Sequence, residues 1–212
     1  MRDVILHDYF RSSAAYRVRI GLNLKGVAYE SCKVDLAAGA QKDETYKALN
    51  PQGFVPMLEI DGHRLTQSLA ILDYLDATRG DPPFVPDDPA DRSHVLAMAT
   101  IIACDIHPLN NLRILKYLKG KLELSEDTKD EWYRHWVREG FDALEKLAAP
   151  RAGTFLFGDA PTLADICLVP QLYNARRFSV PIHDYPHLRR AGETACAHPA
   201  FAAAHPDLQE QH

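Results

Sequence analysis

A proline-rich stretch near the middle of the chain limits the possible folds more than any other feature. Four prolines fall within residues 80–89, Gly-Asp-Pro-Pro-Phe-Val-Pro-Asp-Asp-Pro. Because proline lacks a backbone N–H and clashes with the preceding helical turn, neither a helix nor a central strand can run through this stretch. Strand and helix patterns alternate before it, whereas only helical periodicity follows it. The sequence therefore predicts a first domain over residues 1–80, a linker over 81–89 and a second domain over 90–212.

The first domain has the pattern of an α/β unit. The expected elements are a strand at 3–8, a helix at 14–25, a strand at 29–35, strands at 57–60 and 64–66, and a helix at 68–78. Gly26 would end the first helix, and Asp61-Gly62 is typical of a two-residue hairpin turn. A strand, a helix and a strand in succession predict parallel pairing of the first two strands.

The second domain is expected to be entirely helical. Apolar residues recur there every three or four positions, and no comparable strand pattern returns. The run Pro161-Thr162-Leu163-Ala164-Asp165 predicts the start of a helix with a capping box, in which Thr162 is the N-cap and Asp165 bonds back to its N–H.

Composition narrows the classes of partner. The net charge is −5 and basic residues form no run, which argues against a nucleic-acid surface. We expect no membrane partner and a cytoplasmic location, since no secretory signal pattern and no membrane-spanning run are evident. The four cysteines include no C-x-x-C pair, and no cluster of histidine, carboxylate or thiolate supports a metal site.

The turn between the first strand and the first helix is suited to hold an anion. It places Arg11, Ser12 and Ser13 at the start of a helix, where unpaired N–H groups stabilise a thiolate, carboxylate or phosphate. The turn contains no cysteine, so a thiolate used there must come from a cofactor. The alternative is that the two serines only cap the helix.

Two further segments could contribute to such a site. Pro56 precedes a strand, and a cis Val55-Pro56 bond would turn the backbone groups of Val55 outward, where they could pair with an extended peptide; a trans bond is the alternative. Gln67 and Ser68 begin the last helix of the first domain, so their N–H groups also face an anion-accepting position. Ser68 as a simple N-cap is the alternative there.

These motifs together resemble the zeta class of glutathione transferases, over nearly the whole chain. The residues that carry the resemblance are Arg11-Ser12-Ser13, Arg17-Val18-Arg19-Ile20, Asn50-Pro51-Gln52 with Val55-Pro56, Gln67-Ser68, Pro161 to Asp165 and Leu168 to Phe178. The resemblance implies a thioredoxin-like α/β domain followed by an all-α domain, a homodimer, glutathione as cofactor and a cis Val55-Pro56 bond.

The resemblance also implies roles for individual residues. Ser12 would bond the glutathione sulfur, Val55 the cysteinyl backbone, and Gln67 with Ser68 the γ-glutamyl carboxylate. The wider glutathione site would include Ser13, Gln52, Pro56 and His107. His107 would lie near the thiol, either as a catalytic or as a structural residue. Arg11, Arg113 and Arg177 would hold a dicarboxylate substrate. Since adjacent helical residues cannot both face one cleft, we favour Arg177 over Arg176.

The expected function is glutathione-dependent cis–trans isomerisation of a maleyl-keto acid, either maleylacetoacetate or maleylpyruvate, to its fumaryl isomer. Members of the class often carry cysteine where this chain has Ala14, which argues against reductive dehalogenation. The alternatives are a general transferase that conjugates electrophiles and a non-catalytic module that binds glutathione.

Overall fold

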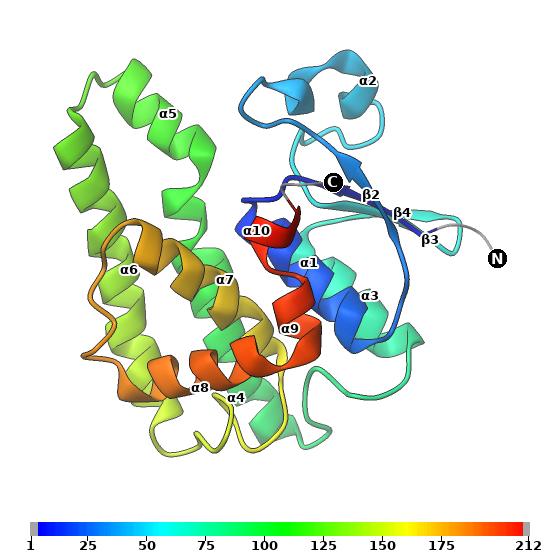
Figure 1. Cartoon of the computed structure of the whole chain (residues 1–212), viewed down its shortest axis with the longest axis vertical. Coiled ribbons are helices and arrows are strands. Elements are labelled where there is room, and N and C mark those ends of the chain that lie inside the picture. The colour runs from blue at the N-terminus through cyan, green and yellow to red at the C-terminus, as the bar shows by residue number, and fades with distance from the viewer. Residues whose placement is uncertain (1–3, 210–212) are drawn as a thin grey trace. The chain divides into compact units, whose positions relative to one another are not determined.

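The computed structural model describes residues 4–209 (Figure 1). They form two compact units. The first unit runs to Pro83 and takes up the chain again at His198, and the second is Phe84–Ala197. The sequence predicts a single helical domain over 90–212, so this expectation differs from the structure at its C-terminal end. The physical reason is that Pro199–Ala203, within the described residues 198–209, pack on a helix of the first unit.

The first unit contains a four-stranded sheet in the order β2-β1-β3-β4. Its strands are β1 (Ile5–Asp8), β2 (Glu30–Lys33), β3 (Met57–Ile60) and β4 (His63–Thr66). β1 and β2 pair in parallel, as predicted, while β3 pairs antiparallel with both β1 and β4. The predicted hairpin turn is confirmed, because Asp61 and Gly62 have positive φ of 52° and 83°. The start of the predicted first strand, at residue 3, lies outside the described residues.

Helices α1 (Ser13–Leu24) and α3 (Ser68–Thr78) pack against each other beside this sheet (Figure 1). Their apolar sides are buried, including Val18 and Leu22 of α1 and Leu72 of α3. Gly26, at φ 62°, follows the end of α1 as predicted. Beyond the second unit, α9 (Pro199–Ala203) also packs on α1, and α10 (Pro206–Gln209) follows it.

Two short helices were not predicted. η1 (Ala40–Lys42) and α2 (Glu44–Lys47) lie between β2 and β3. Tyr46 of α2 is buried in a small apolar cluster with Val34 and Val55. This cluster holds the segment that leads to Val55.

The second unit is helical, as predicted. Its elements are α4 (Pro89–Thr100), the π-helix η2 (Ile101–Ile106), the 3-10 helix η3 (Pro108–Asn110), α5 (Leu112–Gly120), α6 (Glu126–Ala148), α7 (Leu163–Arg177) and α8 (Pro186–Ala197). Most residues of α7 are buried, and the predicted capping box of Thr162 and Asp165 is present at its start. The fully buried Asp165 carboxylate also accepts a hydrogen bond from the Leu156 N–H at 2.8 Å.

We expected no run that could span a membrane, but one segment passes that test on length and composition alone. Among residues 4–209, the helical segment Pro89–Gly120 is long and apolar enough to cross a membrane. This is weak evidence for a membrane span, since a helix that faces a protein core passes the same test. Val95, Met98 and Ile102 of this segment are buried within the second unit.

Candidate active site

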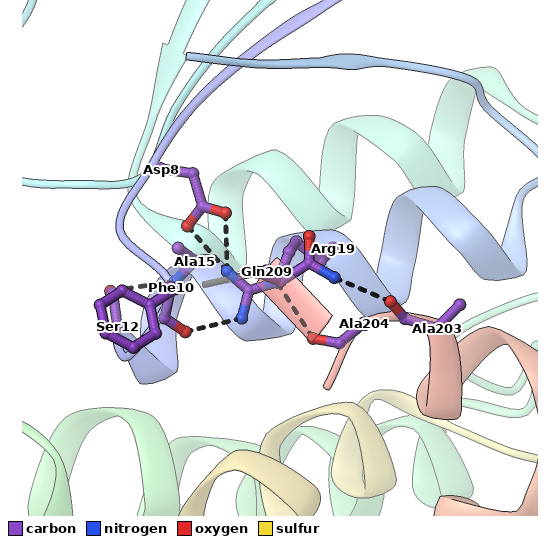
Figure 2. Close-up of polar contacts among 8 residues, drawn as sticks. All are labelled: Asp8, Phe10, Ser12, Ala15, Arg19, Ala203, Ala204 and Gln209. Atoms are coloured by element: carbon purple, nitrogen blue, oxygen red, sulfur yellow. Dashed lines mark hydrogen bonds and ion pairs between the residues drawn. The ribbon is translucent and has the colours of Figure 1, made fainter. Parts of the chain in front are cut away.

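The serine turn of the first unit has the geometry of a helix cap. Ser12 is the N-cap of α1, and its Oγ accepts a hydrogen bond from the Ala15 N–H at 3.2 Å (Figure 2). Ser12 therefore does cap the helix. The cap uses only the hydroxyl oxygen as an acceptor, and a hydroxyl also has one proton to donate. Within residues 4–209, no hydrogen bond donated by the Ser12 hydroxyl is present. Its proton is available to an anion at the positive end of α1.

The flanking residues of this turn differ in exposure. Arg11 is exposed, and its guanidinium lies over the Phe10 ring at 4.8 Å from the centroid. Ser13, the first residue of α1, is buried. Arg11 can therefore reach solvent or a ligand, whereas Ser13 contributes its backbone N–H at the start of the helix.

The Val55-Pro56 bond is cis, as the resemblance implies. Among the described residues, the N–H and C=O of Val55 take part in no hydrogen bond. The preceding carbonyl, that of Phe54, accepts from the Tyr46 hydroxyl at 2.6 Å and from the Asn50 amide at 2.8 Å. Burial raises the pKa of Tyr46 to about 12, so this hydroxyl stays protonated as a donor. The loop is thus held on one side of Val55 while Val55 itself keeps a free donor and acceptor.

The start of α3 forms a third anion-accepting position. Gln67 precedes the helix in a left-handed conformation, φ 68°, and its side chain does not cap the helix. Instead its amide donates to the Gln52 amide oxygen at 2.6 Å. The Ser68 hydroxyl is buried and accepts from the Arg17 guanidinium at 3.3 Å. A strained residue held in this way is often found at a ligand site.

Strand register brings these three segments to one end of the sheet. Met57 of β3 pairs with His7 of β1 on one side and with Thr66 of β4 on the other. The serine turn follows β1, the cis bond precedes β3, and Gln67 follows β4. The structure therefore gathers the predicted glutathione residues of the first unit: Ser12, Ser13, Gln52, Val55, Pro56, Gln67 and Ser68.

In the second unit, His107 lies between two irregular helical turns. Its N–H donates to the Ile102 carbonyl at 3.0 Å, a π-type bond, and Pro108 then begins η3. Such π-helical turns are rare and often occur at functional sites. His107 is half-buried.

Helix α6 fixes the segment that follows His107. The Trp132 indole donates to the Leu109 carbonyl at 2.9 Å, and the Asn110 amide donates to the Tyr133 carbonyl at 3.3 Å. Gly140 lets α6 approach η2 closely, because a Cβ at this position would overlap the side chain of Ile106. Local sequence patterns did not predict this support; Trp132 and Trp136, at helical spacing, are its only local signal.

The candidate substrate arginines of this unit are both exposed. Arg113 lies in the first turn of α5, where its N–H donates to the side chain of the N-cap Asn111. Arg177 ends α7 and lies 5.8 Å from the centroid of the Phe178 ring. That ring stacks on Tyr133, at 3.6 Å between centroids. The stack therefore places Arg177 beside the helix that holds the His107 segment.

Arg176 has a different charged neighbourhood. Its charge acts on the thiol of Cys196, whose pKa is raised mainly by burial. The two adjacent arginines thus have different neighbours, and the choice of Arg177 over Arg176 stays a prediction. No group of three or more histidine, cysteine or acidic residues in the described part of the chain could hold a metal ion.

Comparison with known proteins gives close relatives. Residues 2–77 match the glutathione S-transferase N-terminal domain, and residues 129–191 match the glutathione S-transferase C-terminal domain. The chain is 47% identical over 206 residues to maleylacetoacetate isomerase of Rhizobium meliloti, covering 97% of each chain.

Solved structures of similar proteins come from the same family. The holo structure of a maleylpyruvate isomerase, a bacterial glutathione S-transferase of the zeta class, matches with a TM-score of 0.95 at 42% identity, over 97% of this chain and 98% of that one. Maleylacetoacetate isomerase from Methylobacterium extorquens AM1, with bound malonate and glutathione, matches with a TM-score of 0.93 at 41% identity, over 97% of each chain.

Proposed function

Because the chain belongs to the zeta class of the glutathione S-transferase family, we propose that it is a glutathione-dependent isomerase that converts a maleyl-keto acid into its fumaryl isomer. The substrate is maleylacetoacetate or maleylpyruvate. The observation that carries the proposal is the Ser12 hydroxyl, which caps α1 and still has its proton to donate.

Glutathione fits the residues of the first unit. Its cysteinyl backbone can pair with the free N–H and C=O of Val55, as an added strand would. Its γ-glutamyl carboxylate suits the start of α3, where Gln67 leaves the first N–H groups without a side-chain cap. When bound, glutathione supplies a thiolate that adds reversibly to a conjugated double bond, which lets that bond rotate before the sulfur leaves.

The task of Ser12 is to keep this sulfur ionised. A free thiol has a pKa of about 8.5, so only a few per cent of it is thiolate at pH 7. A hydroxyl donor and a helix N-terminus that lower this pKa by one to two units would contribute about 1.4 to 2.7 kcal/mol. Ser12 supplies both from one position.

The arginines would hold the substrate. A dicarboxylate carries two negative charges, and further charge develops on its acyl oxygens during addition, so planar donors that bind carboxylates in pairs are suited to it. Arg11, Arg113 and Arg177 are all exposed, as such a role requires. His107 would lie near the thiol. The homodimer and the cytoplasmic location belong to the same proposal.

The test follows the absorbance of maleylacetoacetate and of maleylpyruvate with and without glutathione. We expect turnover of at least one substrate, and only when glutathione is present. Turnover of neither, or turnover that does not depend on glutathione, would contradict the proposal. A chloro-aromatic electrophile in the same assay identifies a general conjugating transferase, which would react with it and ignore both maleyl acids.

A further inference from the structure

Arg19 is a buried arginine that the proposed reaction does not use directly. Its side chain is fully buried, and its guanidinium donates to both carboxylate oxygens of Asp8, at 2.8 and 2.7 Å (Figure 2). It also donates to the Phe10 carbonyl at 3.0 Å and to the Ala204 carbonyl at 3.1 Å. A buried charge is costly unless it is paired and hydrogen-bonded. These contacts satisfy the charge and make three separate segments depend on one side chain.

The three segments are the end of β1, the residues around Phe10 and the residues around Ala204, and the first two lead directly into the serine turn. Asp8 is the last residue of β1, and Phe10 lies within the turn, two residues before Ser12. The Ser12 N–H itself donates to the Tyr9 carbonyl at 2.8 Å. Because Arg19 lies on the helix that Ser12 caps, its bonds fix the end of the strand and the turn relative to the axis of that helix.

The third segment supports the turn from residues 199–209. The Asn23 amide donates to the Ala200 carbonyl at 2.9 Å, and Phe201 of α9 is fully buried. The Gln209 amide donates to the Ala203 carbonyl at 2.9 Å (Figure 2). This segment is thus anchored along α1 and places the Ala204 carbonyl at the Nε of Arg19.

We propose that Arg19 is a positioning residue for the thiol site, which sets the Ser12 hydroxyl by tying the end of β1, the serine turn and residue 204 to α1. The inference rests on the proposed function, because it requires Ser12 to donate to the glutathione sulfur. A hydrogen bond weakens steeply once its geometry is lost, so a functional group must be held to within about 0.5 Å. Loosening the turn therefore reduces what the Ser12 hydroxyl contributes to the thiolate.

Two substitutions separate positioning from charge. Arg19→Lys keeps a positive charge beside Asp8, but a single ammonium group cannot reproduce the planar arrangement of donors that reaches three segments. Arg19→Met removes the charge and the bonds together. The main measurement is the pH dependence of the ultraviolet absorbance of the thiolate of bound glutathione, with thermal unfolding recorded beside it.

Lys25→Met is the matched control, at the other end of the same helix. The buried Lys25 ammonium donates to Asp76 at 2.9 Å, to the Gly80 carbonyl at 2.9 Å and to the Pro82 carbonyl at 2.7 Å. It ties three acceptors to α1 much as Arg19 does, but away from the serine turn. Its loss should lower the unfolding temperature and leave the thiol pKa unchanged.

We expect Arg19→Lys to raise the apparent pKa of bound glutathione by about 0.5 to 1 unit, which means about three- to tenfold less thiolate well below that pKa. kcat/KM should fall by the same factor at pH 6 and recover toward pH 9, where the thiol ionises without help. This pH-dependent recovery would not accompany a general loss of folded protein.

Three outcomes would overturn the inference. A thiol pKa that rises in Arg19→Met but not in Arg19→Lys would show an effect of charge alone. A rise in Lys25→Met as large as that in Arg19→Lys would show that any loosening of α1 suffices. A rise in Ser12→Ala with none in either Arg19 variant would leave the proposed function intact and reduce Arg19 to a structural residue. If Ser12→Ala also fails to raise the pKa, the role of Ser12 in the proposed function fails as well.

Discussion

Substitutions of Ser12 can separate its two roles, because capping uses the oxygen and thiol activation uses the proton. Ser12→Ala removes both functions. Ser12→Gly also removes both, but glycine is itself tolerated at an N-cap, and Ser12→Thr keeps a hydroxyl. The three variants therefore change helix stability and thiol chemistry in different combinations.

The expected magnitudes follow from the geometry of the turn. Loss of the bond from the Ala15 N–H to Ser12 Oγ should cost about 0.5–2 kcal/mol in the alanine variant and only a few tenths in the glycine variant. Loss of a hydrogen bond to a charged sulfur should cost about 1.5–3 kcal/mol, which raises the thiol pKa by about 1 to 2 units. The glycine variant should thus be nearly as stable as the wild type and have the raised pKa.

Urea unfolding measures the first effect, and the pH titration of the thiolate absorbance of bound glutathione measures the second. The threonine variant should stay close to the wild type in both. If the alanine and glycine variants bind glutathione with an unchanged thiol pKa, Ser12 is only a helix cap and the reasoning is refuted.

Three further predictions concern the second unit. Arg177→Ala should raise KM and lower kcat for the dicarboxylate without changing glutathione affinity, whereas Arg176→Ala, the matched control, should change neither; equal effects would remove Arg177 from the site. Burial raises the pKa of Asp165 to about 6, above the value of about 3.9 in an unfolded chain. Between these two pH values the folded state therefore binds more protons than the unfolded state. The contribution of Asp165 to stability thus falls as pH rises from about 4 to about 6. Urea unfolding should show the stability of the wild type relative to Asp165→Asn decreasing by about 3 kcal/mol over that range, and parallel pH curves would disprove the shift. Gly140→Ala should destabilise the protein by about 1 kcal/mol, since overpacking against Ile106 costs about 1–3 kcal/mol and the gain in helix propensity offsets about 1; a more stable variant would show that Ile106 moves away without cost.

The sequence predicted the parts of the fold that depend on local patterns. The two short strands at 57–60 and 64–66 were predicted around Asp61-Gly62, because this hairpin turn needs two residues with positive φ. Thr162 and Asp165 located the start of α7, since their capping bonds join residues only three positions apart. Gln52, Val55 and Gln67 were placed in the site by resemblance, and the strand register explains why they converge.

The features that were missed depend on contacts between distant residues. The π-helical turn before His107 has nearly the same apolar spacing as an α-helix, so periodicity does not distinguish them. Arg17 and Arg19 belong to one of the motifs that carry the family resemblance. Their burial could not be predicted, because their partners, Ser68 and Asp8, lie elsewhere in the chain. Local patterns likewise gave no reason to assign residues 198–209 to the first unit.

The bond between Arg19 and the Ala204 carbonyl joins residues 185 positions apart, and this distance fixes when the bond can form during synthesis. A ribosome adding about 5–20 residues per second needs roughly 10–40 s to travel from one residue to the other. The whole helical unit is made in that interval. During this time the strands of the first unit already exist, but the buried Arg19 guanidinium still lacks the Ala204 carbonyl as an acceptor. The serine turn therefore gains this support only after residue 204 has been made, long after Ser12 itself.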